Sequence, residues 1–427
     1  MTPQALLSRV LSEDRGRLLA ALISRVGDFQ RAEDALQEAA ASALVHWGRA
    51  GVPASPTGWL LRAALRKAID GYRRDTTLAR HRDAIAVLAE EEAAEPDPQT
   101  VPDDRLRLIF TCCHPALEEK TRIALTLRSL CGLTTPQVAA VFLDVEATMG
   151  QRLSRAKAKI AAARIPYAIP GPEDLPERLN SVLTVVYLIF TAGYAQGPAT
   201  GTDLCDEAIF LARLLQSLAP DQPEVEGALA LLLITHARRA ARMRQGETVA
   251  LSDQDRALWD RALLNEGLAI LDTATARRRP GPFQIKAAIA ALQCQTPADW
   301  PQIAALYLGL YRHETTPVVR LNLAVALAEA GSLPDALAIL AALEASLTDY
   351  QPYHAACAEY FARAGDLTKA HAAYDRAVAL ATPADAAFLS RRRAHLAKKK
   401  AEHDARPSPT GRYEGTRARS SSLREFK

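Results

Sequence analysis

Apolar residues recur along this chain at the three- and four-residue spacing of amphipathic helices, and no stretch sustains the alternation of a half-buried strand. Aromatic residues make up only 6% of the chain, and alanine and leucine recur throughout. This composition favours helices over strands. The pattern predicts an all-α fold, with two small helical domains and one larger α-helical domain, and a length of 427 residues suits about three domains.

Breaks in the helical pattern divide the chain into five segments. Residues 166–176 read P-Y-A-I-P-G-P-E-D-L-P, which is typical of a domain boundary. The expected segments are a helical domain over 1–80, an acidic flexible linker over 81–103, a second helical domain over 104–165, a larger helical domain over 166–395 and a basic disordered tail over 396–427.

The larger helical domain contains a repeat. Residues 328–338 (A-E-A-G-S-L-P-D-A-L-A) match residues 362–372 (A-R-A-G-D-L-T-K-A-H-A) at an offset of 34 residues, 362 minus 328. The offset, the glycine and the small residues follow the tetratricopeptide (TPR) pattern, in which each repeat is a pair of helices. Because two copies alone are marginal, we expect the helices before them to stack on them in a TPR-like domain.

Charge is segregated along a chain whose net charge is only +3. Residues 62–82 carry seven Arg or Lys against two Asp or Glu, and residues 83–104 carry eight acidic residues and no basic one. Residues 391–427 carry twelve basic residues against four acidic ones. Such asymmetry indicates a nucleic-acid partner, although each run taken alone is usually a solvated surface.

Two motifs are suited to contact DNA. Residues 59–74 predict a helix with an apolar stripe on one side and Arg and Lys on the other, after a proline-containing loop over 49–57. Residues 133–160 predict a helix-turn-helix with a basic second helix. Gly132 is expected to end the helix before it, and Thr134 or Thr135 to cap the next one. A protein with both motifs is expected to bind DNA at two places.

Motifs of enzymes, metal sites and membrane spans are missing from the sequence. Neither H-E-x-x-H nor G-x-x-x-x-G-K-[ST] occurs, and the six cysteines lack metal-ligand spacing. The N-terminus is charged where a signal peptide needs an apolar core, and the longest apolar stretch, near 182–195, is too short for a bilayer. We therefore expect no catalysis, no cofactor, no metal, no membrane contact and a cytoplasmic location.

Taken in order, these segments resemble an RNA polymerase sigma factor of the extracytoplasmic-function (ECF) type. Residues 27–75, from G-D-F-Q-R-A-E-D-A-L-Q-E-A to G-W-L-L-R-A-A-L-R-K-A-I-D-G-Y-R-R-D, look like region 2, and residues 104–160 look like region 4. The remainder is similar to the extension of an ECF subgroup that carries a TPR-like domain. The resemblance implies that the protein binds core RNA polymerase and promoter DNA, with region 2 taking the melted minus-10 element and region 4 the minus-35 element.

The resemblance also implies which residues contact DNA. A melted strand needs a basic groove with stacking surfaces, and a duplex is read by a helix in the major groove. The expected contacts of region 2 are Ser55, Trp59, Arg62, Arg66, Lys67, Arg73 and Arg74. Those of region 4 are Thr135, Gln137, Glu146, Thr148, Gln151, Arg152, Arg155 and Lys157, of which Lys157 suits a phosphate. Trp47 and Trp59 each fit either a core anchor or a stacking platform.

An acidic helix face resembles the family surface that docks on polymerase. Apolar residues between positions 36 and 47 recur at helical spacing, which leaves Glu33, Asp34, Gln37 and Glu38 toward solvent or a partner. The pattern alone is that of an ordinary solvated face. The resemblance implies contact with the clamp helices of the β′ subunit, and with the β flap through region 4.

Two interpretations of the whole chain stay open. The first is a sigma factor whose C-terminal helical domain regulates it in cis, with a protein or peptide regulator on the TPR-like surface. Packing of that domain on region 4 for stability alone explains the same length. The alternative is a helix-turn-helix transcriptional activator with a TPR sensor domain, although such activators generally need a nucleotide site and have no region-2-like partner.

Overall fold

The computed structural model describes residues 2–74, 104–142, 144–196, 203–244 and 246–404. Within these ranges the chain is helical apart from one antiparallel hairpin, β1 (Met243–Arg244) with β2 (Glu247–Thr248), so the predicted all-α fold is confirmed. The predicted linker over 81–103 and residues 405–427 of the predicted tail lie outside the described residues, whereas residues 396–404 of that tail are helical. Contacts divide the chain into two units. The first contains Met1–Ala240, Arg256–Asp299 and Arg312–Glu314, and the second contains Ala241–Asp255, Trp300–Tyr311 and Thr315–Lys427.

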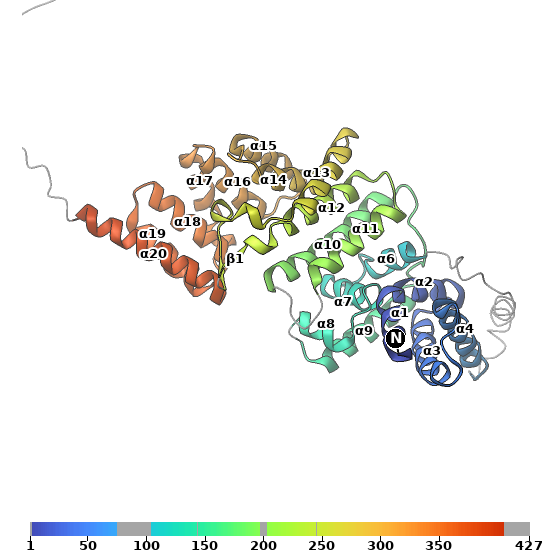
Figure 1. The fold of residues 1–427 in the computed structure, drawn as a ribbon. Coiled ribbons are helices and arrows are strands. Elements are labelled where there is room, and N and C mark those ends of the chain that lie inside the picture. The colour runs from blue at the N-terminus through green and yellow to red at the C-terminus, as the bar shows by residue number, and fades with distance from the viewer. Residues whose placement is uncertain (1, 75–103, 143, 197–202, 245, 405–427) are drawn as a thin grey trace, which may run out of the picture. The chain divides into compact units, whose positions relative to one another are not determined.

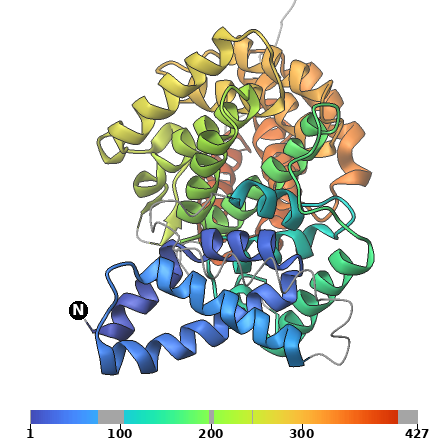
Figure 2. The ribbon, with the colours of Figure 1, turned by 90° about the vertical axis from the view of Figure 1, so that its right-hand side faces the viewer.

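Four helices form the first bundle of unit 1 (blue in Figures 1 and 2). They are α1 (Pro3–Glu13), α2 (Arg15–Val26), α3 (Phe29–Ala50) and α4 (Pro56–Arg74). The Asp28 carboxylate caps α3 by accepting a hydrogen bond from the Arg31 N–H at 2.8 Å. Leu36 and Trp47 of α3 are at most 1% exposed. Leu44, one position off that stripe, is 44% exposed.

A second bundle follows, with the predicted helix-turn-helix in it. Its helices are α6 (Arg105–Cys112), α7 (Glu119–Ser129), α8 (Thr135–Val141) and α9 (Glu146–Ala162). Gly132, after the end of α7, has a φ of 73°, which glycine adopts without strain. Thr134 caps α8 in a capping box with Gln137. The predicted turn residues are confirmed, with Thr134 rather than Thr135 as the cap.

Helix α2 joins the two bundles because each bundle covers one side of it. It packs against α3 and α4 of the first bundle and against α6 of the second. Nine of its 12 residues are buried. A Cβ at Gly16 would lie 3.0 Å from the Leu130 carbonyl oxygen, so α2 approaches the backbone after α7 closely. The two bundles therefore share an interface with an apolar centre.

Five more helices complete unit 1. They are α10 (Leu175–Gln196), α11 (Leu204–Leu218), α12 (Pro223–His236), α13 (Arg261–Ala276) and α14 (Pro282–Gln293), with short 3-10 turns η1 (Arg239–Ala241) and η3 (Arg256–Leu258) between α12 and α13. Helix α10 packs against α6 and α7. The expected division at 166–176 therefore does not separate two contact units: the first helices beyond it belong with the first two bundles.

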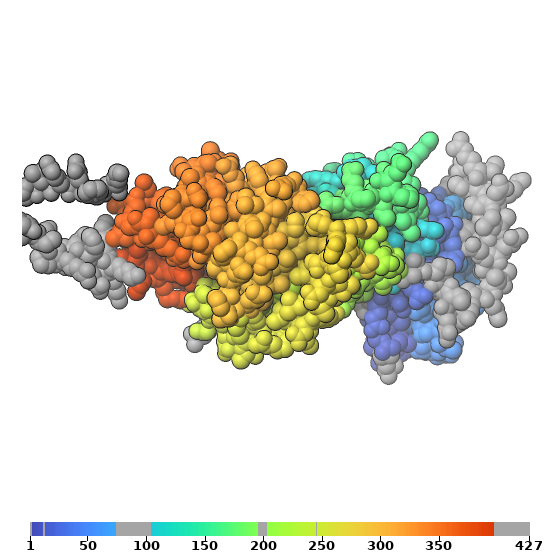
Figure 3. All heavy atoms as spheres, turned by 90° about the horizontal axis from the view of Figure 1, so that it is seen from above, coloured from blue at the N-terminus to red at the C-terminus, as the bar shows by residue number. Residues whose placement is uncertain are grey.

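Unit 2 contains the repeated segment. Its helices are α15 (Trp300–Tyr311), α16 (Pro317–Glu329), α17 (Leu333–Leu343), α18 (Gln351–Arg363), α19 (Leu367–Ala379) and α20 (Pro383–Asp404), with 3-10 turns η2 (Leu251–Asp253) and η4 (Glu344–Ser346). Helix α18 begins 34 residues after α16 (351 minus 317) and α19 begins 34 after α17 (367 minus 333). Gly331 and Gly365 make the equivalent turns with φ values of 99° and 83°. These TPR-like hairpins and α20 form a closely packed block (orange to red in Figure 3).

Candidate nucleic-acid and polymerase interface

Helix α4 presents the predicted basic face. Leu61, Leu65 and Ile69 on its apolar side are only 2–3% exposed. Arg62 and Arg66, one turn apart on the opposite side, are exposed. Burial of the apolar stripe thus fixes α4 on the bundle and turns a ridge of positive charge outward.

The loop before α4 positions its first turn and a pair of tryptophans. Ser55 Oγ accepts a hydrogen bond from the Gly58 N–H at 3.2 Å, so it caps the start of α4. The Trp47 and Trp59 rings meet edge to face at 5.6 Å, and His46 stacks on Trp59 at 5.4 Å. Trp47 is 1% exposed and anchors the core, whereas Trp59 is only half-buried.

The remaining predicted contacts of region 2 lie farther along α4. Lys67 is half-buried and pairs with Glu38 of α3 at 3.9 Å. Arg73 is exposed and pairs with Asp70 at the same distance. The side chain of Arg74 lies outside the described residues. Pairs this long and exposed are weak, so they leave both side chains able to turn to a phosphate.

Helix α9 presents most of the predicted recognition surface. Met149 and Leu153 fix its inner side, at 0% and 5% exposed. Arg152 is half-buried and pairs with Asp144, just before α9, at 3.2 Å. To contact a base edge, Arg152 must therefore give up its ion pair with Asp144. The exposed members of the predicted set on α9 are Glu146, Thr148, Gln151 and Arg155.

The two predicted contacts on α8 lie in its first turn. Thr135 is the first residue of the helix and is half-buried. Gln137 Oε1 accepts a hydrogen bond from the Thr134 N–H at 2.8 Å, which closes the capping box. Gln137 therefore has a structural role at the helix start that the sequence pattern did not assign to it.

The predicted acidic face is only partly exposed. Asp34, Gln37 and Glu38 are exposed, but Glu33 is 3% exposed. The expectation that Glu33 faces solvent is wrong, because α9 lies against this side of α3. The sequence pattern of α3 gives no indication that Glu33 is buried, because this pattern is the same as that of a solvated acidic face.

Three basic residues surround the Glu33 carboxylate. Arg15 of α2 lies 2.8 Å from it, Lys157 of α9 lies 2.7 Å from it, and Arg128 of α7 lies 3.5 Å from it. Burial by itself raises the pKa of Glu33, but the three cations together hold that pKa below its ordinary value. Burial, with Arg128 close by, lowers the pKa of Arg15 to about 10. We call these four residues the Glu33 cluster.

Sequence reasoning missed most of the Glu33 cluster. It assigned Lys157 to a DNA phosphate, whereas the Lys157 side chain is 14% exposed and points at Glu33. It assigned no role to Arg15 or Arg128. Glu33 and Lys157 are 124 residues apart in the chain, so helical periodicity, which relates near neighbours, has no means of pairing them.

The helix-turn-helix bundle also contacts α10 on its other side. Arg178 of α10 donates to the Phe110 carbonyl oxygen at 2.8 Å, and Arg122 of α7 donates to Ser181 Oγ at 2.7 Å. Ser181 in turn donates to the Cys113 carbonyl oxygen at 3.3 Å. These contacts join the helix-turn-helix bundle to the first helix of the C-terminal extension.

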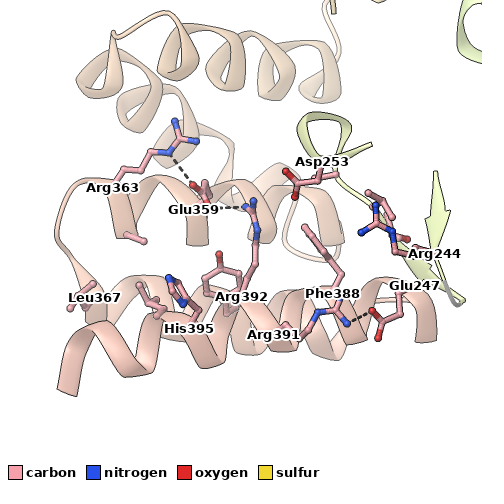
Figure 4. Close-up of a pocket in the computed structure, with 16 residues that line it drawn as sticks. Arg244, Glu247, Asp253, Glu359, Arg363, Leu367, Phe388, Arg391, Arg392 and His395 are labelled. Carbon is pink, nitrogen blue, oxygen red and sulfur yellow. Dashed lines mark hydrogen bonds and ion pairs between the residues drawn. The ribbon is translucent and has the colours of Figure 1, made fainter. Parts of the chain in front are cut away.

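Unit 2 has a groove of about 650 Å³ between the β-hairpin and α18–α20 (Figure 4). Arg391 of α20 pairs with Glu247 of β2. Arg392 and Arg363 both pair with Glu359 of α18, at 2.9 Å and 3.0 Å. The groove is large enough for a small molecule or a peptide side chain.

An apolar wall and one further arginine complete this groove. The Arg392 guanidinium lies 5.2 Å from the centre of the Phe388 ring, and Tyr374, which also lines the groove, is 4% exposed. Arg244 of β1 is exposed across the opening from α20 (Figure 4). Arginine guanidinium groups around an aromatic side chain suit a ligand that carries carboxylates.

Neither a metal site nor a membrane-spanning helix occurs in the part of the chain that the structure covers. There, no group of three or more His, Cys, Asp or Glu side chains is suited to hold a metal ion. Among the same residues, no helix has the length and apolar character to cross a membrane. Adjacent Cys112 and Cys113 are buried free thiols, and burial raises the pKa of both.

An outward basic helix in one bundle and a helix-turn-helix in the next define a helical protein with two DNA-contacting domains. Residues 11–77 match Sigma-70 region 2, and residues 107–160 match Sigma-70, region 4. Residues 178–275 match a family of unknown function, DUF6596. The chain belongs to the sigma-70 family of RNA polymerase sigma factors, with a helical C-terminal extension.

One relative matches this chain over most of the length of both proteins. Uncharacterized protein R00370 of Rhizobium meliloti (strain 1021) is 41% identical over 411 residues, which cover 93% of this chain and 97% of the relative. No solved structure matches the chain. Sigma factors are non-enzymatic DNA-binding proteins that bind core RNA polymerase and direct promoter-specific initiation, and the sigma-70 regions place this chain among them.

Proposed function

We propose that this sigma factor takes the melted minus-10 element on α4 and the loop before it, reads the minus-35 element with α9, and is regulated in cis by its C-terminal helical domain. The observation that supports this most strongly is the outward ridge of Arg62 and Arg66 on a helix whose other side is buried. Two basic residues one turn apart follow a strand backbone, and half-buried Trp59 at the start of the helix offers a ring for a base.

The minus-35 element meets the exposed residues of α9. Gln151 suits adenine and Arg155 suits guanine, because each side chain can form two hydrogen bonds to that base edge. Arg152 also suits guanine, and Asp144 holds it close to the helix start until DNA competes for it. Glu146 and Thr148, at the N-terminal end of the helix, are placed where a recognition helix approaches bases.

Core polymerase docks on the acidic face of α3 and on region 4. Asp34 and Glu38 are exposed there and supply negative charge for the clamp helices of β′, while region 4 meets the β flap. Reversing the charge at Asp34 to Lys should weaken core binding and leave the fold intact, because Asp34 is exposed and its carboxylate accepts a hydrogen bond from Gln30 on its own helix. Undiminished core binding by this variant would contradict the assignment.

Run-off transcription tests the function directly. Purified core polymerase, this protein and DNA from upstream of its own gene should give transcripts that are absent without the protein. The double variant Arg62→Ala/Arg66→Ala should bind core normally but lose transcripts, and affinity for single-stranded minus-10 DNA should fall with them. If the protein binds promoter DNA but never binds core polymerase, the activator alternative explains it better.

Cis-regulation draws support from the groove of unit 2, which we assign to an acidic protein or peptide regulator. Arg391→Ala should change transcription in cells, because it removes a guanidinium that lines the groove. Arg393→Ala is the matched control: Arg393 is on the same helix but pairs with Asp375 at 2.6 Å and does not line the groove. Equal effects of the two variants would remove the groove from the proposal.

A further inference from the structure

A second pocket of the C-terminal extension has no part in the function proposed above. It has a volume of about 630 Å³ and is bordered by α10, the start of α12 and the loop between α13 and α14. His313 and Glu314, just after α15, complete the border, and every residue that lines it belongs to unit 1. We call it the α10 pocket. Its volume suits a small organic molecule.

One wall of the α10 pocket is apolar. Leu179 and Leu183 of α10 line it and are 4% and 1% exposed, and Leu175, in the first turn of the same helix, is half-buried. Four proline rings add rigid apolar surface around these leucines: Pro172, Pro176, Pro223 and Pro282. A wall of this kind suits the hydrocarbon part of a ligand.

The two acidic residues of the α10 pocket already have protein partners. The Glu224 carboxylate accepts hydrogen bonds from the backbone N–H and the side-chain amide of Gln284, at 3.2 and 3.0 Å. A Cβ at Gly281 would collide with this carboxylate, so the missing side chain at that position leaves room for it. Glu314 pairs with Lys286 at 2.7 Å. Neither acid therefore needs a cationic ligand to balance its charge.

One arginine of the α10 pocket has no such partner. Arg279 is exposed in the loop between α13 and α14, and its guanidinium makes no ion pair or hydrogen bond with the residues that the structure describes. Arg277, two positions earlier, pairs with both Glu226 and Asp221. The exposed imidazole of His313 supplies a further hydrogen-bonding group. An apolar wall beside an unpaired guanidinium favours an amphipathic anion.

We infer that the α10 pocket binds a small amphipathic carboxylate, with its hydrocarbon part on α10 and its carboxylate at Arg279. A guanidinium can donate two parallel hydrogen bonds to a carboxylate, which fixes the orientation of the ligand.

A ligand in the α10 pocket contacts the helix that holds region 4. Leu179 lines the pocket, and its neighbour Arg178 donates to the Phe110 carbonyl oxygen of the helix-turn-helix bundle at 2.8 Å. Ser181, two positions further on, donates to the Cys113 carbonyl oxygen. Occupancy of the pocket should therefore change transcription. Binding of the carboxylate is independent of the proposed function, whereas its effect on transcription rests on that function.

Three probes that share one hydrocarbon chain test the class of ligand: octanoate, octanol and octylamine. In a ligand-detected NMR titration of the full-length protein, octanoate should bind about 10-fold more tightly than octanol, because a hydrogen bond to a charged group adds to the apolar contact. Octylamine should not bind. Equal affinities for the three probes, or no binding of octanoate, would overturn the inference.

Variants of the pocket locate the bound carboxylate. Arg279→Gln should weaken octanoate binding about 10-fold and leave octanol binding unchanged, because it removes the guanidinium alone. Arg278→Gln is the matched control, since Arg278 is exposed in the same loop but does not line the pocket. Leu175→Asp should weaken binding of both probes by placing a charge on the apolar wall. Equal octanoate affinities of Arg279→Gln and Arg278→Gln, or undiminished binding by Leu175→Asp, would show that the probe binds elsewhere and would refute the assignment.

Run-off transcription with and without octanoate separates the site from its effect. A change in transcript yield that occurs in the natural protein and in Arg278→Gln, but not in Arg279→Gln, supports coupling through α10. An unchanged yield despite octanoate binding removes the coupling and leaves the binding site in place. If no transcripts form even without octanoate, the proposed function fails, and the NMR titration still decides whether the pocket binds a carboxylate.

Discussion

Neutralising Glu33 should loosen the contact between regions 2 and 4 by an amount that follows from its surroundings. Glu33→Gln removes the charge that attracts Lys157 and Arg128 and leaves three cations facing one another. Breaking a fully buried ion pair costs about 3–5 kcal/mol, and an exposed one costs about 0–1 kcal/mol. The Lys157 and Arg128 side chains are 14% and 18% exposed, against 4% for Glu33, so the pairs lie nearer the buried limit. We expect Glu33→Gln to make the contact between regions 2 and 4 less favourable by about 2–3 kcal/mol.

Two adjacent cysteines provide the assay. Cys112 is buried on α6, which packs against α2 of region 2, and Glu33 is among the charges near its thiol. Cys113 Sγ lies 3.5 Å from Thr126 Oγ1, and its carbonyl oxygen accepts from Ser181 of α10. Opening between regions 2 and 4 therefore exposes Cys112 and spares Cys113. The loss of 2–3 kcal/mol corresponds to about 30- to 150-fold faster labelling of Cys112 by a thiol reagent.

The control for Glu33→Gln is Glu38→Gln on the same helix. Glu38 is 52% exposed and pairs only weakly, at 3.9 Å, with Lys67, so its loss should leave both labelling rates unchanged. Mass spectrometry of the peptide that contains both thiols resolves the two sites. Equal acceleration of Cys112 and Cys113 in Glu33→Gln would mean that region 4 unfolds, and an unchanged Cys112 rate would mean that the Glu33 cluster does not hold the regions together.

Three further predictions concern pH, packing and DNA. Because the pKa of Glu33 lies below its ordinary value of 4.5 in the folded protein, its stabilisation of the contact between regions 2 and 4 is complete above that pH and is lost as pH falls through the lowered pKa; energy transfer between dyes on Gln37→Cys and Ser154→Cys, whose positions line one pocket between the two regions, should fall in that range. Gly227→Ala should cost about 1–3 kcal/mol by calorimetry, since the new Cβ would lie 2.7 Å from the Gln284 nitrogen, whereas Gly150→Ala, with no atom within 4 Å, should gain about 0.5–1 kcal/mol. Arg152→Ala should weaken binding to minus-35 duplex by about 1–3 kcal/mol in an anisotropy titration, and unchanged affinity would remove Arg152 from the recognition set.

Local features of the fold could be predicted from the sequence because their causes are local. The cap of α8 depends on Thr134 and Gln137, three residues apart, and the TPR-like hairpins follow from a repeat visible at one offset. The exposed ridge of Arg62 and Arg66 follows from the 3.6-residue period of α4. In each case the residues that decide the structure are close together or occur twice.

The buried position of Glu33 could not be predicted because its cause is distant. Its four-residue cluster draws on α2, α3, α7 and α9, and no periodicity relates these segments. An acidic residue on a helix is ordinarily solvated, so the exposed interpretation was the reasonable one for Glu33 as for Asp34. Only the packing of region 4 against region 2 distinguishes these two neighbours.

The contacts of region 4 also decide which of its two interfaces can open. On the α10 side, Arg178, Arg122 and Ser181 bond to it directly. On the region 2 side, the contact contains two open pockets and a charge cluster in which Glu33 keeps Arg15 after separation. Opening should therefore occur between regions 2 and 4, and α10 should move with region 4.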